Sequence, residues 1–283
     1  MGPNVANLSQ QERMQEVLRM LETRDSVHVA ELSKAFAVSE VTVRSDLSEL
    51  ARQGLVARVR GGVRPLQRGQ SELGFDFRLR LEVERKRAIA KAAATLVEEG
   101  QAIALDSSTT AYYLALELRT KKELVVVTNG LLIAAALADA PGISVLVTGG
   151  MLRLHAMSLV GDLGADALRG TRISRGFLGA RGLAIDDGLM DLNPDEVRIK
   201  REMASVCERV IGIVDGTKWH RTALLPFVAT DQVDAIVTDT GAPWEEVEAW
   251  RGRDVEIVCV EPAEGAQPAA PPGLRRLSAA YPR

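Results

Sequence analysis

A series of short apolar runs, each ending in a polar or glycine cluster, constrains the fold of this chain more than any other feature. The runs read QAIALD, ELVVVTNG, ISVLVTGG, RVIGIVDGTK and VDAIVTD, and helical, alanine-rich segments lie between them. Apolar strands bounded by helices are typical of a parallel sheet covered on both faces. We therefore predict that residues 78–260 form an α/β domain with a Rossmann-like parallel sheet.

The polar clusters that end these runs predict a ligand site, because ligands bind at the carboxyl ends of strands in such sheets. The candidates are Asp106, Ser107, Ser108, Thr109, Thr110, Thr128, Asn129, Gly149, Gly150, Asp215 and Lys218. The SSTT turn leads into a helix, where free N–H groups and hydroxyls together favour a bound phosphate. The alternative is that these four residues supply only a helix N-cap.

A helical segment, GLMDLNPDEVRIKREM, adds Glu196 and Lys200, which are one helical turn apart. One interpretation is a surface ion pair worth about 0.3–0.5 kcal/mol. The other is that Lys200 reaches a ligand phosphate. The spacing alone does not decide between them.

The first 65 residues have a different pattern, of short helices followed by a basic turn. Gln11–Leu21 and Val29–Phe36 carry apolar residues at helical spacing, and Ser39 stands at an N-cap position before a third helix. Gly54 ends that helix, and LVARVRGGVRPL alternates apolar and basic residues around a Gly-Gly pair, as a small hairpin does. The pattern predicts a winged helix-turn-helix over residues 9–65.

The basic hairpin points to DNA, since no acidic residue occurs between Leu50 and Ser71 in a chain of formal net charge −3. Arg52, Arg58, Arg60, Arg64 and Arg68 surround the hairpin and the end of the third helix, where a phosphate backbone would pass. The alternative is a three-helix interaction module whose arginines form a solvated face. The predicted DNA-contacting residues are Ser39, Glu40, Thr42, Arg44, Ser45, Arg58, Arg60, Gly61 and Gly62.

The stretch VSEVTVRSDLSELARQGLVARVRGGV resembles the signature of the DeoR-type regulators. The segments DSSTT, VVTNG, TGG, FLGARGL, DEVRIKREM and VDGTKW follow in the order found in the DeoR sensor domain. Ser45 stands where the family commonly has a second arginine, and Ser108 where many members have glycine. The resemblance implies a sensor domain similar in fold to sugar-phosphate isomerases, and a repressor that a phosphorylated sugar releases from its operator. It also implies phosphate contacts from Ser107 to Thr110.

An enzyme related to the sugar-phosphate isomerases is the competing hypothesis. Asp186, Asp187 and Asp191 would then be general bases, with Lys200 or Lys218 stabilising an enediolate. Fold resemblance alone does not carry activity, and this hypothesis leaves the basic hairpin unexplained. We therefore expect a regulator without catalytic residues.

Several further expectations follow from composition. The scattered histidines and two distant cysteines, Cys207 and Cys259, predict neither a metal site nor a disulfide, and no cofactor is expected. No membrane segment or signal peptide is expected, which favours a cytoplasmic protein. Residues 66–77 are expected to be a linker and 261–283 a mobile Pro/Ala-rich tail. The expected partners are double-stranded operator DNA and a sugar-phosphate effector. Further copies of the chain are also expected, because operators carry repeated half-sites.

Overall fold

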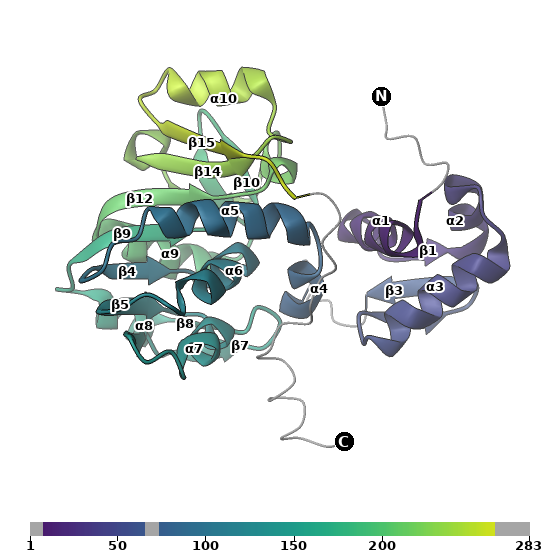
Figure 1. The fold of residues 1–283 in the computed structure, drawn as a ribbon, viewed down its shortest axis with the longest axis horizontal. Coiled ribbons are helices and arrows are strands. Elements are labelled where there is room, and N and C mark those ends of the chain that lie inside the picture. Colours follow the sequence, from purple (N-terminus) through teal and green to yellow (C-terminus); the bar gives the residue numbers. More distant parts are fainter. Residues whose placement is uncertain (1–7, 66–73, 264–283) are drawn as a thin grey trace. The chain divides into compact units, whose positions relative to one another are not determined.

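The computed structural model describes residues 8–65 and 74–263 of the 283-residue chain. The chain divides into two compact units, at the junction of Glu82 and Val83 (Figure 1). Within the described residues, no helix combines the length and the apolar character that a membrane span requires.

The N-terminal unit is a winged helix-turn-helix, as the sequence predicts. It contains helices α1 (Gln10–Thr23), α2 (Val29–Phe36) and α3 (Glu40–Arg52), and the hairpin of strands β2 (Val56–Val59) and β3 (Gly62–Pro65). A short strand, β1 (Val27–His28), pairs with β3 and closes a three-stranded sheet. The apolar residues that occur at helical spacing are buried: Leu18, Leu21 and Leu47 lie in a single core.

Local signals set the ends of these helices. Ser9 and Glu12 form a capping box at the start of α1, and the Ser39 hydroxyl accepts a hydrogen bond from the Thr42 N–H at 3.1 Å at the start of α3. Below the surface, Arg13 of α1 lies 2.7 Å from Asp46 of α3 in a buried ion pair. This pair fixes the position of α3 against α1.

The helix α4 (Phe75–Leu79) begins inside the segment expected to be a linker and extends two residues beyond it. Phe77 and Leu81 pack into the core of the N-terminal unit, so the two units divide later than the expected boundary at residue 78. Residues 66–73 of that segment, and all but the first residues of the expected tail, lie outside the described part of the chain.

The second unit is built on a seven-stranded parallel sheet, as predicted. Its strands lie in the order β15, β14, β12, β9, β4, β5, β6. They are β4 (Ala102–Leu105), β5 (Leu124–Thr128), β6 (Ile143–Val147), β9 (Ile173–Leu178), β12 (Cys207–Ile213), β14 (Ala235–Asp239) and β15 (Glu256–Val260). The first strand, β4, lies between β5 and β9, so the strand order reverses there, where such sheets bind ligands.

Helices cover both faces of this sheet (Figure 1). Helices α5 (Val83–Thr95), α6 (Thr109–Leu118) and α7 (Leu131–Leu137) pack on one face. Helices α8 (Asp162–Leu168), α9 (Pro194–Ser205) and α10 (Trp244–Arg251) share one core on the other. This three-layer arrangement leaves the carboxyl ends of the strands as the place where loops converge.

Two small antiparallel sheets add loops at the carboxyl ends of the strands. Strands β7 (Met151–Arg153) and β8 (Ser158–Val160) form a hairpin. Strands β10 (Gly182–Ala184), β11 (Gly188–Asp191) and β13 (Leu225–Val228) form a three-stranded sheet. These short strands have too few residues for a clear alternation. Strands β7 and β8 supply Arg153 and Ser158, two site residues that the sequence did not reveal.

Candidate functional site

Lys200 lies at the centre of a buried ion cluster at the carboxyl end of the sheet. Its Nζ lies 2.6 Å from Asp191 Oδ2 and 3.0 Å from Asp106 Oδ2, and it donates to the Gly179 carbonyl at 2.8 Å. Asp106 follows β4 and Gly179 follows β9, so the cluster lies where the strand order reverses. The Phe227 ring lies 4.8 Å from the ammonium. These contacts hold β4, β9 and β11 together.

The carboxylates keep Lys200 charged although its side chain is buried. Burial alone would lower the pKa of Lys200, but the charges of Asp191 and Asp106 outweigh it and raise the pKa. Burial likewise opposes ionisation of Asp191, yet Lys200 and Arg181 lower its pKa to about 2. Three protein oxygens already surround the three donors of this ammonium. A ligand that contacts Lys200 directly must therefore replace one of them.

Glu196 connects four other elements of the site. Its Oε1 accepts from Arg153 Nη1 at 2.7 Å and from the Ser158 hydroxyl. Its Oε2 accepts from Ser107 Oγ at 3.2 Å and from Asn129 Nδ2 at 3.4 Å. The carboxylate therefore brings the ends of β4 and β5 and the β7–β8 hairpin into one small volume.

The interpretation of Glu196 and Lys200 as a surface ion pair is wrong. Both side chains are buried, and each binds different partners. The helical spacing predicts correctly that they share a face of α9. It does not reveal that this face is directed toward the strand ends, where Glu196 pairs with Arg153 and Lys200 pairs with Asp191.

The amino-terminus of α6 faces the same volume. Ser108 is the N-cap, because its Oγ accepts from the Ala111 N–H at 3.1 Å, so one hydroxyl of the SSTT turn does serve as a cap. Within the described part of the chain, the backbone N–H groups of Thr109 and Thr110 have no hydrogen-bond partner. Free amides at the positive end of a helix dipole are suited to bind an anion.

Two buried oxygen atoms at the ends of β5 and β6 also lack a partner among the described residues: Asn129 Oδ1 and Thr148 Oγ1. Thr148 precedes Gly149 and Gly150, whose φ angles of +78° and +112° carry the chain into the β7–β8 hairpin. An unpaired buried polar atom costs free energy, which a ligand hydroxyl would recover. These atoms can therefore recognise a polyhydroxylated ligand.

Other predicted site residues bond within their own turns. Thr128 Oγ1 accepts from the Gly130 N–H at 3.0 Å, and Asp215 Oδ1 accepts from the Thr217 N–H at 3.0 Å. Burial raises the pKa of Asp215, but the charges of Lys218 and Lys86 lower it overall. Lys86 belongs to α5, so the end of β12 is tied electrostatically to the first helix of this unit.

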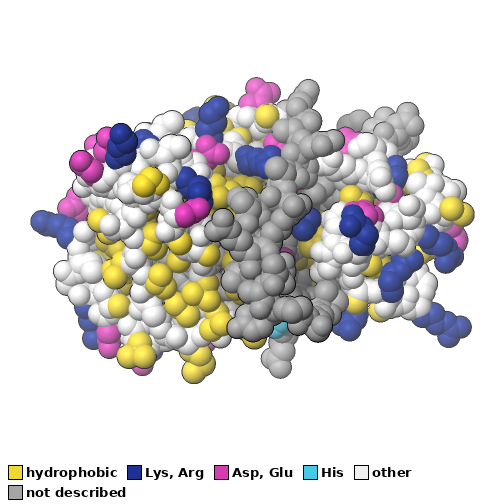
Figure 2. Space-filling view, turned by 60° about the horizontal axis from the view of Figure 1, so that its bottom comes forward, with side chains coloured by type: hydrophobic (Ala, Val, Ile, Leu, Met, Phe, Trp, Pro, Cys, Tyr) yellow, Lys and Arg dark blue, Asp and Glu magenta, His cyan; other side chains and the backbone are white. Residues whose placement is uncertain are grey.

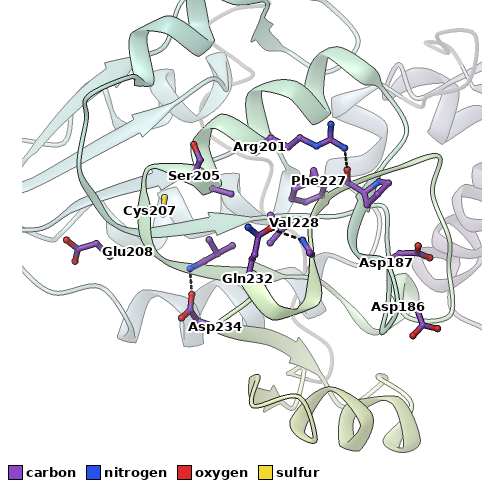
Figure 3. A pocket seen from close by; sticks show the side chains of 14 residues that line it. Asp186, Asp187, Arg201, Ser205, Cys207, Glu208, Phe227, Val228, Gln232 and Asp234 are labelled. Carbon is purple, nitrogen blue, oxygen red and sulfur yellow. Dashed lines mark hydrogen bonds between the residues drawn. The ribbon is translucent and has the colours of Figure 1, made fainter.

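The acidic residues of the enzyme hypothesis do not gather at one site. Asp186 and Asp187 occupy the turn between β10 and β11 and line a groove beside the amino-terminal end of β12 (Figure 3). Glu208 and Asp234 also line this groove, and one cation, Arg201, does not balance the four carboxylates, so the groove disfavours a phosphate. Of the three expected bases, only Asp191 lies at the carboxyl ends of the strands, where it is bound to Lys200.

The exposed face of α3 is the second candidate site. Glu40, Arg44 and Ser45 are exposed along it, and Thr42 is half-buried. Arg44 lies 2.9 Å from Glu40, a pair that uses one of the five N–H donors of its guanidinium group. Val41, which the sequence analysis did not select, is 76% exposed in the first turn. A solvent-facing valine there is suited to contact a thymine methyl group.

The β2–β3 hairpin, or wing, places arginines next to this helix. Arg58, Arg60 and Arg64 are exposed, and Arg58 Nη2 lies 3.4 Å from Ser48 Oγ of α3. Gly61 has φ +75° at the tip. Gly62 is buried, and a Cβ there would lie 2.0 Å from the Val27 carbonyl. The fold itself thus requires Gly62. Arg52 pairs with Glu49 at 2.6 Å, and Arg68 lies outside the described residues.

Family models match the chain in both units. The model described as the DeoR-like helix-turn-helix domain matches residues 13–68, and the one described as the DeoR C terminal sensor domain matches residues 81–240. The chain therefore belongs to the DeoR family of transcriptional regulators, with a DNA-binding domain followed by a sensor domain.

Curated relatives extend along most of the chain. It is 34% identical to the putative aga operon transcriptional repressor of Escherichia coli O157:H7, over 88% of this chain and 93% of that protein. It is 36% identical to the transcriptional regulator GolR of Listeria innocua, over 81% of this chain and 90% of that protein. It is 30% identical to the glycerol-3-phosphate regulon repressor of Escherichia coli K12, over 83% of this chain and 93% of that protein. These relatives are regulators rather than enzymes, which sets the enzyme hypothesis aside.

Among solved structures, ribose 5-phosphate isomerase A from Neisseria gonorrhoeae aligns with 47% of this chain and 52% of its own, at 18% identity and a TM-score of 0.34. A likeness this low carries no argument about function.

Proposed function

We propose that this protein represses a carbohydrate-metabolism operon and leaves its operator when a phosphorylated sugar binds at the ends of β4, β5 and β6. One observation carries the proposal. Unpartnered α6 amides lie beside a chain of polar side chains, Ser107 to Glu196 to Asn129, linked at 3.2 and 3.4 Å. An anion site and a hydroxyl-binding site therefore adjoin each other, and this is the chemistry that a sugar phosphate requires.

In this proposal the phosphate binds the Thr109 and Thr110 amides, while the sugar hydroxyls bind Glu196 and Asn129 Oδ1. The name of one relative, the glycerol-3-phosphate regulon repressor, supports a phosphorylated polyol as the effector. The DNA would lie against α3 and the wing, with α3 in the major groove. A homo-oligomer in the cytoplasm, where the operator is, belongs to the same proposal.

A matched pair of substitutions at Thr109 tests the anion site. Thr109 is the first residue of α6, and Ser108 before it has φ −72° and ψ 155°, a conformation that a following proline permits. Thr109→Pro removes one amide proton while the helix is retained, and Thr109→Ala keeps that proton. Helix α9 already begins with a proline, Pro194, in this way.

The measurement is thermal stabilisation of the full chain by a panel of phosphorylated sugars, their unphosphorylated forms and inorganic phosphate. A true effector at 100 times its Kd adds about 2.7 kcal/mol to the free energy of unfolding. We expect Thr109→Pro to weaken binding by about 10- to 100-fold, since one hydrogen bond to a charged group is lost, and Thr109→Ala to bind more nearly as wild type does. Equal binding by both variants, or no stabilisation by any sugar phosphate, contradicts the proposal.

A further inference from the structure

Strand β6 is an edge of the seven-stranded sheet, and its outer backbone is unpaired. The Gly142 carbonyl and the Thr148 N–H bond toward β5. Because residues of a strand alternate in the side to which their backbone groups point, Val145 and Val147 direct N–H and C=O away from β5. Neither valine has another backbone partner within the described residues.

Lysines, prolines and bulges keep the edge strands of monomeric proteins apart, and none of them occurs within β6, although Pro141 lies two residues before it. No charged residue occurs from Ala140 through Leu152, a range that includes all of β6. The opposite edge of the sheet differs, since β15 begins with Glu256, which lies 3.2 Å from Arg209. The unprotected edge is therefore specific to β6.

An apolar surface surrounds this edge. Exposed side chains come from β5, β6, β7 and α8: Val125, Leu146, Val147, Met151, Leu152 and Leu163. Val125 and Leu146 lie on adjacent strands and on one face, since Val127 pairs with Leu146 in the register. Leu163 precedes Gly164, which packs against the Gly149 carbonyl after β6. Figure 2, which brings forward the lower side of Figure 1, shows hydrophobic side chains gathered over this part of the sensor domain.

We propose that this surface binds the same surface of a second copy of the chain, with the two β6 strands antiparallel about a two-fold axis near Val145. A two-fold interface must be complementary to itself, and an uncharged apolar patch with a free strand edge meets that condition. With the axis at Val145, the two Val145 residues exchange both backbone hydrogen bonds. The inference rests on the proposed function in one respect, because a regulator of repeated half-sites needs a second copy.

Sedimentation velocity of the full chain over a range of concentrations tests this interface. The disrupting variants are Val145→Pro, which removes an outward N–H that β5 does not use, and the pair Leu146→Lys with Leu163→Lys. Leu224→Lys is the matched control, because Leu224 is 70% exposed and Leu163 is 76% exposed. Circular dichroism and thermal melting check that each variant is folded.

We expect wild type and Leu224→Lys to self-associate equally. We expect both disrupting variants to raise the Kd of this contact by about 100-fold, because a tenfold cost per copy counts twice in a symmetric pair. A wild-type chain that stays monomeric overturns the inference, and so do folded variants that associate as wild type does. The proposed function fails separately, if wild type binds no sugar phosphate in the thermal assay. A dissociated variant that still binds the effector separates the two results.

Discussion

Asp191 shows at the scale of one residue how the sensor domain holds its site together. It ends β11, yet its carboxylate lies 2.6 Å from an ammonium on α9. Both side chains are buried, so removing either charge leaves the other unpaired in a region of low dielectric. The pair therefore matters more to stability than an exposed ion pair of the same length.

Asp191→Asn is expected to lower the free energy of unfolding by about 3–5 kcal/mol near pH 7, since Lys200 loses one of its two nearest carboxylates. Because Lys200 and Arg181 overcome the effect of burial and lower the folded-state pKa of Asp191 to about 2, its contribution is complete above about pH 4 and is lost as the pH falls through 2. Urea unfolding of both proteins between pH 3 and pH 7 measures this. A difference that grows as the pH falls contradicts the assignment.

A second residue-scale prediction concerns the wing. Arg60 is exposed and has no partner among the described residues, so it is free to contact a phosphate. We expect Arg60→Ala to weaken binding to all DNA sequences alike and to reduce the slope of log K against log salt by about 0.9. Arg24→Ala is the control, since Arg24 pairs with Glu31 of α2. An unchanged salt slope for Arg60→Ala, measured by fluorescence anisotropy, removes the wing from the DNA interface.

At the scale of elements, α5 connects the strand ends to the start of the sensor domain. It begins at Val83, directly after the division between the units. Arg85 Nη1 lies 2.6 Å from Asp239 Oδ1, and Asp239 Oδ2 accepts from the Gly216 N–H at 2.7 Å. A ligand that shifts the turn after β12 would therefore act on the helix that follows the DNA-binding unit.

Arg85→Ala tests this connection. We expect the variant to bind DNA and the effector about as tightly as wild type, but the effector to change its DNA affinity less, by about 0.5–2 kcal/mol of coupling. Arg87→Ala is a matched control on α5, since Arg87 pairs with Glu84 one turn earlier in the same helix. DNA titrations with and without saturating effector provide the values. If the effector changes the DNA affinity of Arg85→Ala as much as that of wild type, the pair of Arg85 and Asp239 does not carry the coupling.

The sequence predicts some elements well and others not, for physical reasons. The helices of the N-terminal unit and strands such as β5 have periodicity and capping signals, and Ser39 and Gly54 mark the ends of α3 as expected. Strands of three or four residues, such as β7 and β11, give no period. Arg153, Ser158 and Asp191 were therefore not recognised as partners of α9. Strand order, which brings Asp106 next to Gly179, depends on contacts between distant segments.

At the scale of the whole molecule, two different anion-binding sites are proposed in one chain. Exposed wing arginines suit a polyanion, and the α6 amides suit one small anion beside the carboxylate of Glu196, which Arg153 neutralises. Any effect of the effector on DNA affinity must be matched by an equal effect of DNA on effector affinity. The size of that coupling, commonly about 1–3 kcal/mol, is what makes such a chain a regulator.

The most direct test is the DNA affinity of the full chain, measured by anisotropy on the promoter fragment upstream of its own gene, with each sugar phosphate of the panel in turn. We predict that one phosphorylated sugar raises the Kd for DNA by about 5- to 150-fold. We also predict that its unphosphorylated form does not, and that Thr109→Pro shifts the response to higher ligand concentration. Tight, salt-dependent DNA binding that no phosphorylated sugar changes would contradict the account.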